Sequence, residues 1–131
     1  MAWLVPVAAF LLLLSACTTK VVTPPPPTWP SEVVTQAGTA FYVRNLRLPG
    51  TFQDLRLKQG DSITWLPFDQ VEAVLFTGPV QGVYRPAQIY LGGGGQVRGM
   101  LFVDVLIEGT TDQGYWNIPM SQVERLNIGT E

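Results

Sequence analysis

The chain has 131 residues with 8 basic and 10 acidic side chains, a formal net charge of −2 and no histidine. This length allows one modest domain, and 47% apolar residues are enough for a hydrophobic core. The slightly acidic balance disfavours nucleic-acid binding, which needs Lys and Arg to neutralise phosphates. Without histidine the chain has no Ser-His-Asp triad, imidazole zinc ligand or imidazole base.

The first 16 residues, MAWLVPVAAFLLLLSA, are an apolar run followed by Cys17 and a polar stretch. The run is shorter than the roughly 20 apolar residues that cross a bilayer, and it is typical of a secretory signal peptide. The residues Leu14-Ser15-Ala16-Cys17 resemble the lipobox of bacterial lipoproteins. The resemblance implies cleavage between Ala16 and Cys17, a diacylglycerol on the Cys17 sulfur and an acyl chain such as palmitate on the new amino group. A buried cysteine next to an ordinary signal peptide is the alternative.

Several acyl chains, at about 0.8 kcal/mol for each buried CH₂, hold a protein firmly on a membrane. We therefore expect a lipid-anchored envelope protein whose first partner is the membrane itself. In lipoproteins of the enterobacterial type, Asp after the cysteine favours the inner membrane, and here that residue is Thr18. The resemblance thus favours the outer membrane, facing the periplasm, or the plasma membrane in a bacterium with a single membrane.

Residues 17–37 contain four consecutive prolines, Pro24 to Pro27. Such a run favours polyproline II, which extends by about 3.1 Å per residue without internal hydrogen bonds. We predict a tether without a fold of its own that lifts a domain off the membrane. A docking peptide for an aromatic-lined groove is the alternative.

Residues 38–131 show short β-rich segments separated by turn residues, and no segment has a sustained helical period. In residues 52–58, Leu55 and Leu57 alternate with Asp54, Arg56 and Lys58, which predicts a strand with one buried face. The sequence predicts an all-β domain, a small barrel or sandwich of about eight short strands. Further strands are expected at residues 40–48, 62–66, 86–91, 97–103, the end of the run from there to residue 107, and 114–118.

An internal repeat relates residues 66–76 to residues 118–128 without a gap. Asp69 and Ser121 each precede a glutamate by three residues, Glu72 and Glu124, and this spacing predicts a capping box. We expect one helical turn and then a closing strand in each copy. This order of elements resembles SH3-like barrels in a general way. One barrel or sandwich made of two half-modules is favoured over two separate barrels, because about 40 residues rarely hold a core alone.

Two motifs invite a chemical interpretation. The glycines at 92–95 lack the Lys-Ser/Thr of a phosphate-binding loop, so a hairpin tip is favoured. Asp104, Glu108 and Asp112 surround a turn without the spacing of a calcium-binding loop, so solvated carboxylates and no metal are favoured. No cofactor is expected.

Aromatic and basic residues form the candidate binding surface. Trp65, Tyr115 and Trp116 can stack on sugar rings, although aromatic residues on strands more often belong to a core. The basic residues Arg44, Arg56 and Lys58, together with Arg47, are expected within one hairpin that turns at Pro49-Gly50. This hairpin can meet lipid head groups or peptidoglycan carboxylates. Ordinary solvated cations are the alternative.

The sequence therefore favours a non-enzymatic envelope lipoprotein, an adaptor or structural module that docks on another envelope protein. A module that binds peptidoglycan or another glycan ranks second. A hydrolase ranks last, because no carboxylate has an evident partner that tunes its pKa.

Overall fold

The computed structural model describes residues 30–129. The predicted signal peptide, the lipidation site at Cys17 and residues 18–29 of the predicted tether lie outside these residues, so the statements about them stay predictions. Between residues 30 and 129 there is no helix that is both long and apolar enough to cross a membrane.

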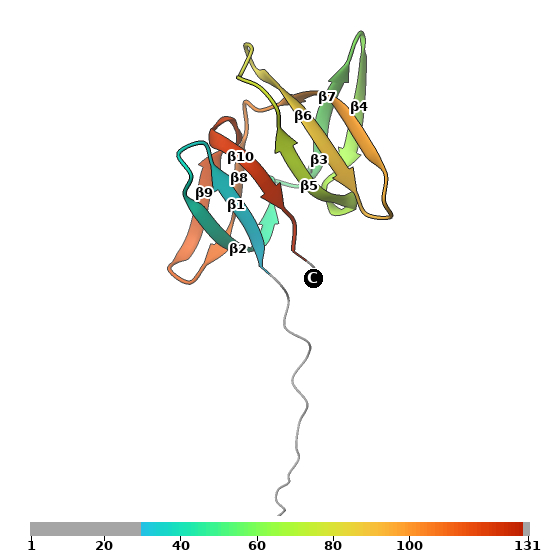
Figure 1. The fold of residues 1–131 in the computed structure, drawn as a ribbon. Coiled ribbons are helices and arrows are strands. Elements are labelled where there is room, and N and C mark those ends of the chain that lie inside the picture. The colour runs from blue at the N-terminus through green and yellow to red at the C-terminus, as the bar shows by residue number, and fades with distance from the viewer. Residues whose placement is uncertain (1–29, 130–131) are drawn as a thin grey trace, which may run out of the picture.

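Within the described residues the chain forms strands and two single-turn 3₁₀ helices (Figure 1). In chain order these are β1 (Ser31–Thr35), β2 (Ala40–Arg47), β3 (Asp54–Gln59), β4 (Ser62–Pro67), η3 (Phe68–Gln70), β5 (Val71–Phe76), β6 (Tyr84–Leu91), β7 (Gln96–Phe102), β8 (Leu106–Thr111), β9 (Gly114–Pro119), η4 (Met120–Gln122) and β10 (Val123–Asn127).

The all-β prediction is confirmed, and the described residues hold ten antiparallel strands in one open sheet instead of about eight. The sequence missed β1, whose residues fell within the predicted tether, and most of β8, which continues through residues 109–111 where a turn was expected. Val33 of β1 is fully buried, and β1 pairs with both β10 and β2. β1 was not predicted because it has only five residues and lies directly after the proline-rich segment.

The strand order of the sheet is β4-β3-β7-β6-β5-β10-β1-β2-β8-β9. We call β3 to β7 the central half, and we call β1, β2, β8, β9 and β10 the terminal half. The central half is one continuous stretch of chain, whereas the terminal half combines the two ends of the domain. The two halves meet at the β5–β10 pair and form two lobes (Figure 1).

The repeat places equivalent elements in the two halves. The η3 and η4 helices both precede the strands that meet at the seam. The Phe68 N–H donates to the Gln53 carbonyl at 2.8 Å, and 52 residues later the Met120 N–H donates to the Val105 carbonyl at 2.8 Å. The sequence repeat is therefore also a repeat of backbone hydrogen bonds.

The hairpin tips are related in the same way. The Gly92 N–H donates to the Gln70 carbonyl at 2.9 Å, and the Gln36 N–H donates to the Gln122 carbonyl at 2.9 Å. Residues 92–95 thus form the tip between β6 and β7, as predicted, and Gly93 and Gly94 have positive φ angles of 98° and 97°. The β1–β2 hairpin of the terminal half corresponds to the β6–β7 hairpin of the central half.

The predicted capping boxes are wrong. Each 3₁₀ helix follows a proline and has no side-chain cap, and Asp69 and Ser121 are the middle residues of the two turns. Glu72 and Glu124 already belong to β5 and β10. A helix of three residues ends before a capping glutamate can reach back, so the motif predicted the turn correctly and its hydrogen bonds wrongly.

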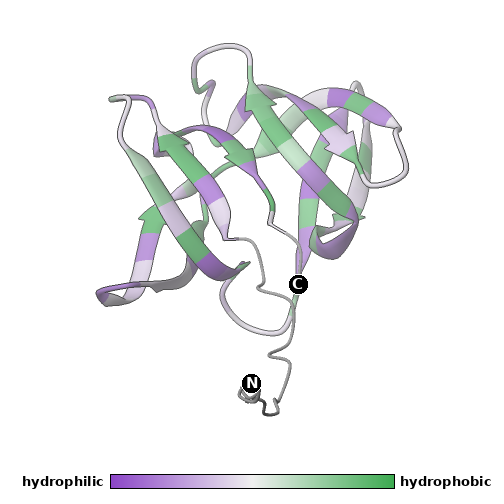
Figure 2. Cartoon of the chain, turned by 60° about the horizontal axis from the view of Figure 1, so that its bottom comes forward, coloured by the Kyte–Doolittle hydropathy of each residue, from purple (hydrophilic) through white to green (hydrophobic). Residues whose placement is uncertain are grey.

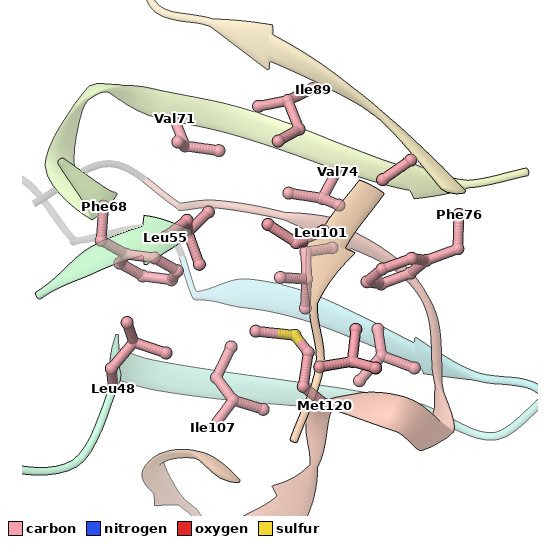
Figure 3. Packing of buried hydrophobic residues seen from close by; sticks show 14 of the residues in the cluster. Leu48, Leu55, Phe68, Val71, Val74, Phe76, Ile89, Leu101, Ile107 and Met120 are labelled. Atoms are coloured by element: carbon pink, nitrogen blue, oxygen red, sulfur yellow. The ribbon is translucent and has the colours of Figure 1, made fainter. Parts of the chain in front are cut away.

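Both halves contribute to one hydrophobic cluster. Hydrophobic and hydrophilic residues alternate along the strands (Figure 2), which leaves each strand one apolar face. Ile107 and Met120 from the terminal half are fully buried and pack with Leu55 and Leu101 of the central half (Figure 3). The inner faces of the two lobes therefore share a core.

A buried arginine ties the halves together at the seam. Arg85 on β6 is 4% exposed, and its guanidinium lies 4.5 Å from the centre of the Phe76 ring. It donates hydrogen bonds to the carbonyl of Gly78 at 2.7 Å, to the carbonyl of Val123 and to the Glu124 carboxylate at 3.1 Å. Since Val123 and Glu124 lie on β10, Arg85 bridges the central and terminal halves.

Candidate functional site

The outward face of β4, β3, β7 and β6 carries the candidate site. Leu57 on β3 and Leu101 on β7 are fully buried, so their neighbours in sequence point away from the core. We call this surface the cation–aromatic face. It consists of Arg56, Lys58, Ile63, Trp65, Tyr84, Met100 and Phe102, with Phe52 from the preceding loop.

The strand register aligns four of these residues in a row. Arg56 is paired with Trp65 across β3 and β4, and Tyr84 is paired with Phe102 across β6 and β7. The pairing of Lys58 with Met100 across β3 and β7 brings Arg56 next to Phe102. Because strands in a sheet are about 4.8 Å apart, the row crosses four strands over about 14 Å.

Arg56 lies at the centre of this row of rings. Its guanidinium carbon is 5.3 Å from the centre of the Phe102 ring, 5.7 Å from that of Tyr84 and 5.8 Å from that of Trp65. The Lys58 ammonium is 5.5 Å from the centre of the Tyr84 ring. Distances below 6 Å place both cations within the range of cation–π attraction.

The positive charges of this face lack acidic partners. Within residues 30–129 neither Arg56 nor Lys58 forms an ion pair, and the Arg56 Nε is buried without a hydrogen-bond partner. Asp54 lies two residues before Arg56, opposite Pro67 at the end of β4. The two rows that contain the cations hold no carboxylate.

A small pocket lies alongside the row, next to Trp65, Arg56 and Phe102. Phe52 and Trp65 meet edge to face, with ring centres 5.3 Å apart and a 78° angle between the ring planes. They are 59% and 48% exposed. Together with Arg56, Phe102 and other neighbours they line a pocket of about 230 Å³. The pocket is open to solvent, and both the Asp54 carboxylate and the Arg56 guanidinium line it, although the two groups form no ion pair.

The terminal half has a different surface at the equivalent place. There Arg47 and Glu108 form an ion pair of 2.9 Å. The Tyr115 hydroxyl donates to the Glu108 carboxylate at 2.8 Å, and the Asn117 amide donates to the Tyr115 hydroxyl at 3.1 Å. Glu108 corresponds to Arg56 in the repeat, and Asn117 corresponds to Trp65. The terminal half therefore pairs its charged side chains at this place, whereas Arg56 and Lys58 of the central half form no ion pair with another described residue.

The six predicted surface residues are not all brought together. Trp65, Arg56 and Lys58 share the cation–aromatic face. Tyr115 lies on β9 at the opposite edge of the sheet, and Arg44 lies on β2 in the terminal half. Trp116 points to the inner side, where its ring centre is 5.3 Å from that of Phe41.

The predicted basic hairpin is wrong. Arg44 and Arg47 lie on β2, which pairs with β1 and β8, whereas Arg56 and Lys58 lie on β3, which pairs with β4 and β7. The link between β2 and β3 crosses from one half to the other. The Gln53 side chain holds this link through hydrogen bonds to backbone groups, among them both the N–H and the carbonyl of Leu48. Pro49-Gly50 therefore starts a crossover and not a hairpin turn.

Sequence reasoning missed Phe52, Tyr84 and Phe102 as site residues. Alternation in residues 97–103 and 86–91 indicates the outward side of each strand. It does not indicate that β7 lies beside β3, because about 40 residues separate these strands in the chain. The strand pairing was the missing information.

The carboxylates named in the sequence analysis fall into separate places. Glu108 pairs with Arg47 and Glu124 pairs with Arg85. Asp69 and Glu72 line a groove of about 1030 Å³ where the two halves meet. No group of three or more His, Cys, Asp and Glu side chains among residues 30–129 is arranged to hold a metal ion.

Comparison with known protein families and with curated proteins finds no match for this chain.

Proposed function

We propose that the chain is a membrane-anchored envelope lipoprotein, and that its β domain is a non-enzymatic adaptor that docks on another envelope component, first of all a protein. The observation that carries this proposal is the cation–aromatic face, with exposed rings and cations that have no acidic partner. The predicted lipid on Cys17 supplies the membrane end, and the face supplies the docking end.

The comparison of the two halves supports a binding role for this face. The terminal half has the same strand order with a closed polar network in place of the rings. The scaffold therefore does not need an exposed row of rings in order to form. Exposed aromatic residues next to unpaired cations are typical of surfaces that contact a partner.

The finer fold proposal is that the two halves are two copies of one five-stranded half-module, each similar to an SH3-like barrel. The shared hydrogen bonds at the 3₁₀ helices support this proposal. The strand order, which reads the same outward from the β5–β10 pair in both directions, also supports it.

The place where the tether joins the domain is compatible with docking. Residue 30 leads directly into β1 in the terminal half, whereas the cation–aromatic face belongs to the central half (Figure 1). A partner on the face therefore contacts a different lobe from the one that follows the tether.

Crosslinking in intact cells, followed by affinity capture of the tagged protein, tests the adaptor role. We expect a stoichiometric envelope component with the acylated protein and its loss with Cys17→Ser, which removes the lipid and mislocalises the domain. Recovery of the protein alone in both forms would contradict the proposal.

A glycan of the cell wall is the second candidate component. The specific observation in its favour is the linear row formed by Trp65, Arg56, Phe102 and Tyr84. Trp65 is exposed and Phe102 and Tyr84 are half-buried, so three of the four positions of the row offer ring surface to a sugar.

A further inference from the structure

The row on the cation–aromatic face has the dimensions of a site for an extended polymer. It spans about 14 Å across four strands, at right angles to their direction. The pocket alongside it, about 230 Å³, is smaller than the roughly 300–1,000 Å³ of sites that enclose a whole small ligand. A pocket of this size suits one ring or one substituent of a longer molecule that continues along the row.

The chemistry of the row combines stacking surfaces with positive charge. Trp65 is 48% exposed, and Tyr84 and Phe102 are half-buried within the face. The C–H faces of sugar rings are apolar and pack on aromatic rings of this kind. The row therefore presents three rings and one guanidinium across four strands, an arrangement that fits a chain of sugars better than a single compact ligand.

The cations define the charge of that polymer. The Arg56 guanidinium lies among three rings, and its Nε has no hydrogen-bond partner. Lys58 is the next cation on the same face and is exposed. Guanidinium and ammonium groups donate charge-assisted hydrogen bonds to carboxylates, so the face matches an acidic saccharide better than a neutral one.

We propose that the cation–aromatic face binds a linear, carboxylate-bearing glycan, laid across β4, β3, β7 and β6, with sugar rings on Trp65 and Tyr84 and carboxylates on Arg56 and Lys58. This inference rests on the proposed docking function and deepens its second candidate, a glycan of the cell wall. A wall polysaccharide that contains uronic acids has this chemistry, and so does a peptidoglycan strand whose muramic acid carboxylates are free of stem peptides.

Two other occupants are less well matched to the face. A peptide that adds a strand to a sheet uses the free backbone groups of an edge strand, and it does not need a row of rings across four strands. A bilayer takes up protruding apolar side chains such as Phe52, Ile63 and Trp65, but it leaves the half-buried Tyr84 and Phe102 of the row without a role. Both become outcomes of the test.

The test uses the full-length acylated protein in detergent micelles, with binding measured by biolayer interferometry. The probes are oligogalacturonate, which carries one carboxylate on each ring, and soluble peptidoglycan fragments. The matched negative probe is the methyl ester of oligogalacturonate, in which the carboxylates are neutral. We expect saturable binding of at least one acidic probe, at least about tenfold weaker binding of the ester, and weakening by salt.

Variants locate the binding on the face. Trp65→Ala and Lys58→Gln are each expected to weaken acidic-glycan binding at least about tenfold. Tyr115→Ala is the matched control, because Tyr115 is 64% exposed on the edge strand of the other half, and it should bind as the wild type does. Lys58→Gln, at an exposed position, keeps the test valid if Trp65→Ala fails to fold, which a thermal melt detects.

Several results would overturn the inference. These are no binding of either acidic glycan, equal binding of the ester, equal effects of Trp65→Ala and Tyr115→Ala, or equally strong binding of poly-glutamate or of phosphatidylglycerol vesicles. Capture of a protein partner in cells that Trp65→Ala abolishes, without glycan binding, would refute the glycan and leave the adaptor function standing. If neither a glycan nor a protein partner binds the face, the glycan inference and the adaptor function are both refuted.

Discussion

Removing the Arg85 side chain should destabilise the domain strongly, because it is the polar link across the β5–β10 seam. Arg85→Ala deletes hydrogen bonds to two carbonyls and one carboxylate and leaves the Gly78 and Val123 carbonyls without this donor. A buried polar group left without a partner costs about 1–3 kcal/mol, and the lost cation–π contact with Phe76 adds about 0.5–2 kcal/mol. We expect the free energy of unfolding to fall by about 3–5 kcal/mol.

The partner carboxylate provides the internal control. The Glu124 side chain is 44% exposed, so its ion pair with Arg85 is screened by solvent and is worth about 1 kcal/mol or less. Glu124→Gln should therefore cost far less than Arg85→Ala in urea unfolding followed by tryptophan fluorescence. If Arg85→Ala changes the unfolding free energy by less than about 1 kcal/mol, or if the two variants cost the same, the assignment of the seam is wrong.

Three further predictions concern packing, caps and anchoring. Gly109→Ala should lower the unfolding free energy by about 1–3 kcal/mol, because the new Cβ would lie 2.3 Å from a valine methyl carbon and 2.8 Å from a backbone oxygen on β2. Gly95→Ala is the control and should cost much less, because its Cβ would lie 3.6 Å from the nearest atom. Equal costs in urea unfolding would contradict this packing. Asp69→Ala and Ser121→Ala should each change the unfolding free energy by no more than about 0.5 kcal/mol, since neither residue caps its 3₁₀ helix. A loss above about 1 kcal/mol would indicate that these residues do act as helix caps. Cys17→Ser should abolish labelling by radioactive palmitate and processing to the mature size, and a membrane-bound variant of mature size would refute the lipobox interpretation.

Local sequence patterns predicted most of the strands correctly. Alternation placed Leu55 and Leu57 in the core and Arg56 and Lys58 outside, as the structure shows. The repeat predicted both helical turns, because a proline that ends a strand and a short polar segment carry the information locally. Strand alternation and turns depend on residues that are close in sequence, and such residues are also close in the folded structure.

The arrangement of the strands was beyond local patterns. The link after Arg47 reads as a tight turn at Pro49-Gly50, yet it leads from the terminal half into the central half. The sequence provides no local signal that distinguishes a hairpin from this crossover, because both need a break at the same place. The basic residues were therefore grouped wrongly.

The candidate site was predictable only in part for the same reason. Trp65 and Arg56 lie on neighbouring strands joined by a short turn, so their contact follows from the β3–β4 hairpin. Phe102 and Tyr84 come from a second hairpin whose position beside the first depends on the whole sheet. Trp116 was misplaced because an aromatic residue on a strand satisfies the pattern on either face.

Photo-crosslinking in living cells shows directly whether an envelope component docks on the cation–aromatic face. A benzophenone amino acid replaces Trp65 in one strain and Tyr115, the exposed aromatic residue of the other half, in a second strain. We predict a discrete adduct from position 65 that disappears when Cys17→Ser is added, and no such adduct from position 115. Equal adducts from both positions, or none from position 65, would contradict the account.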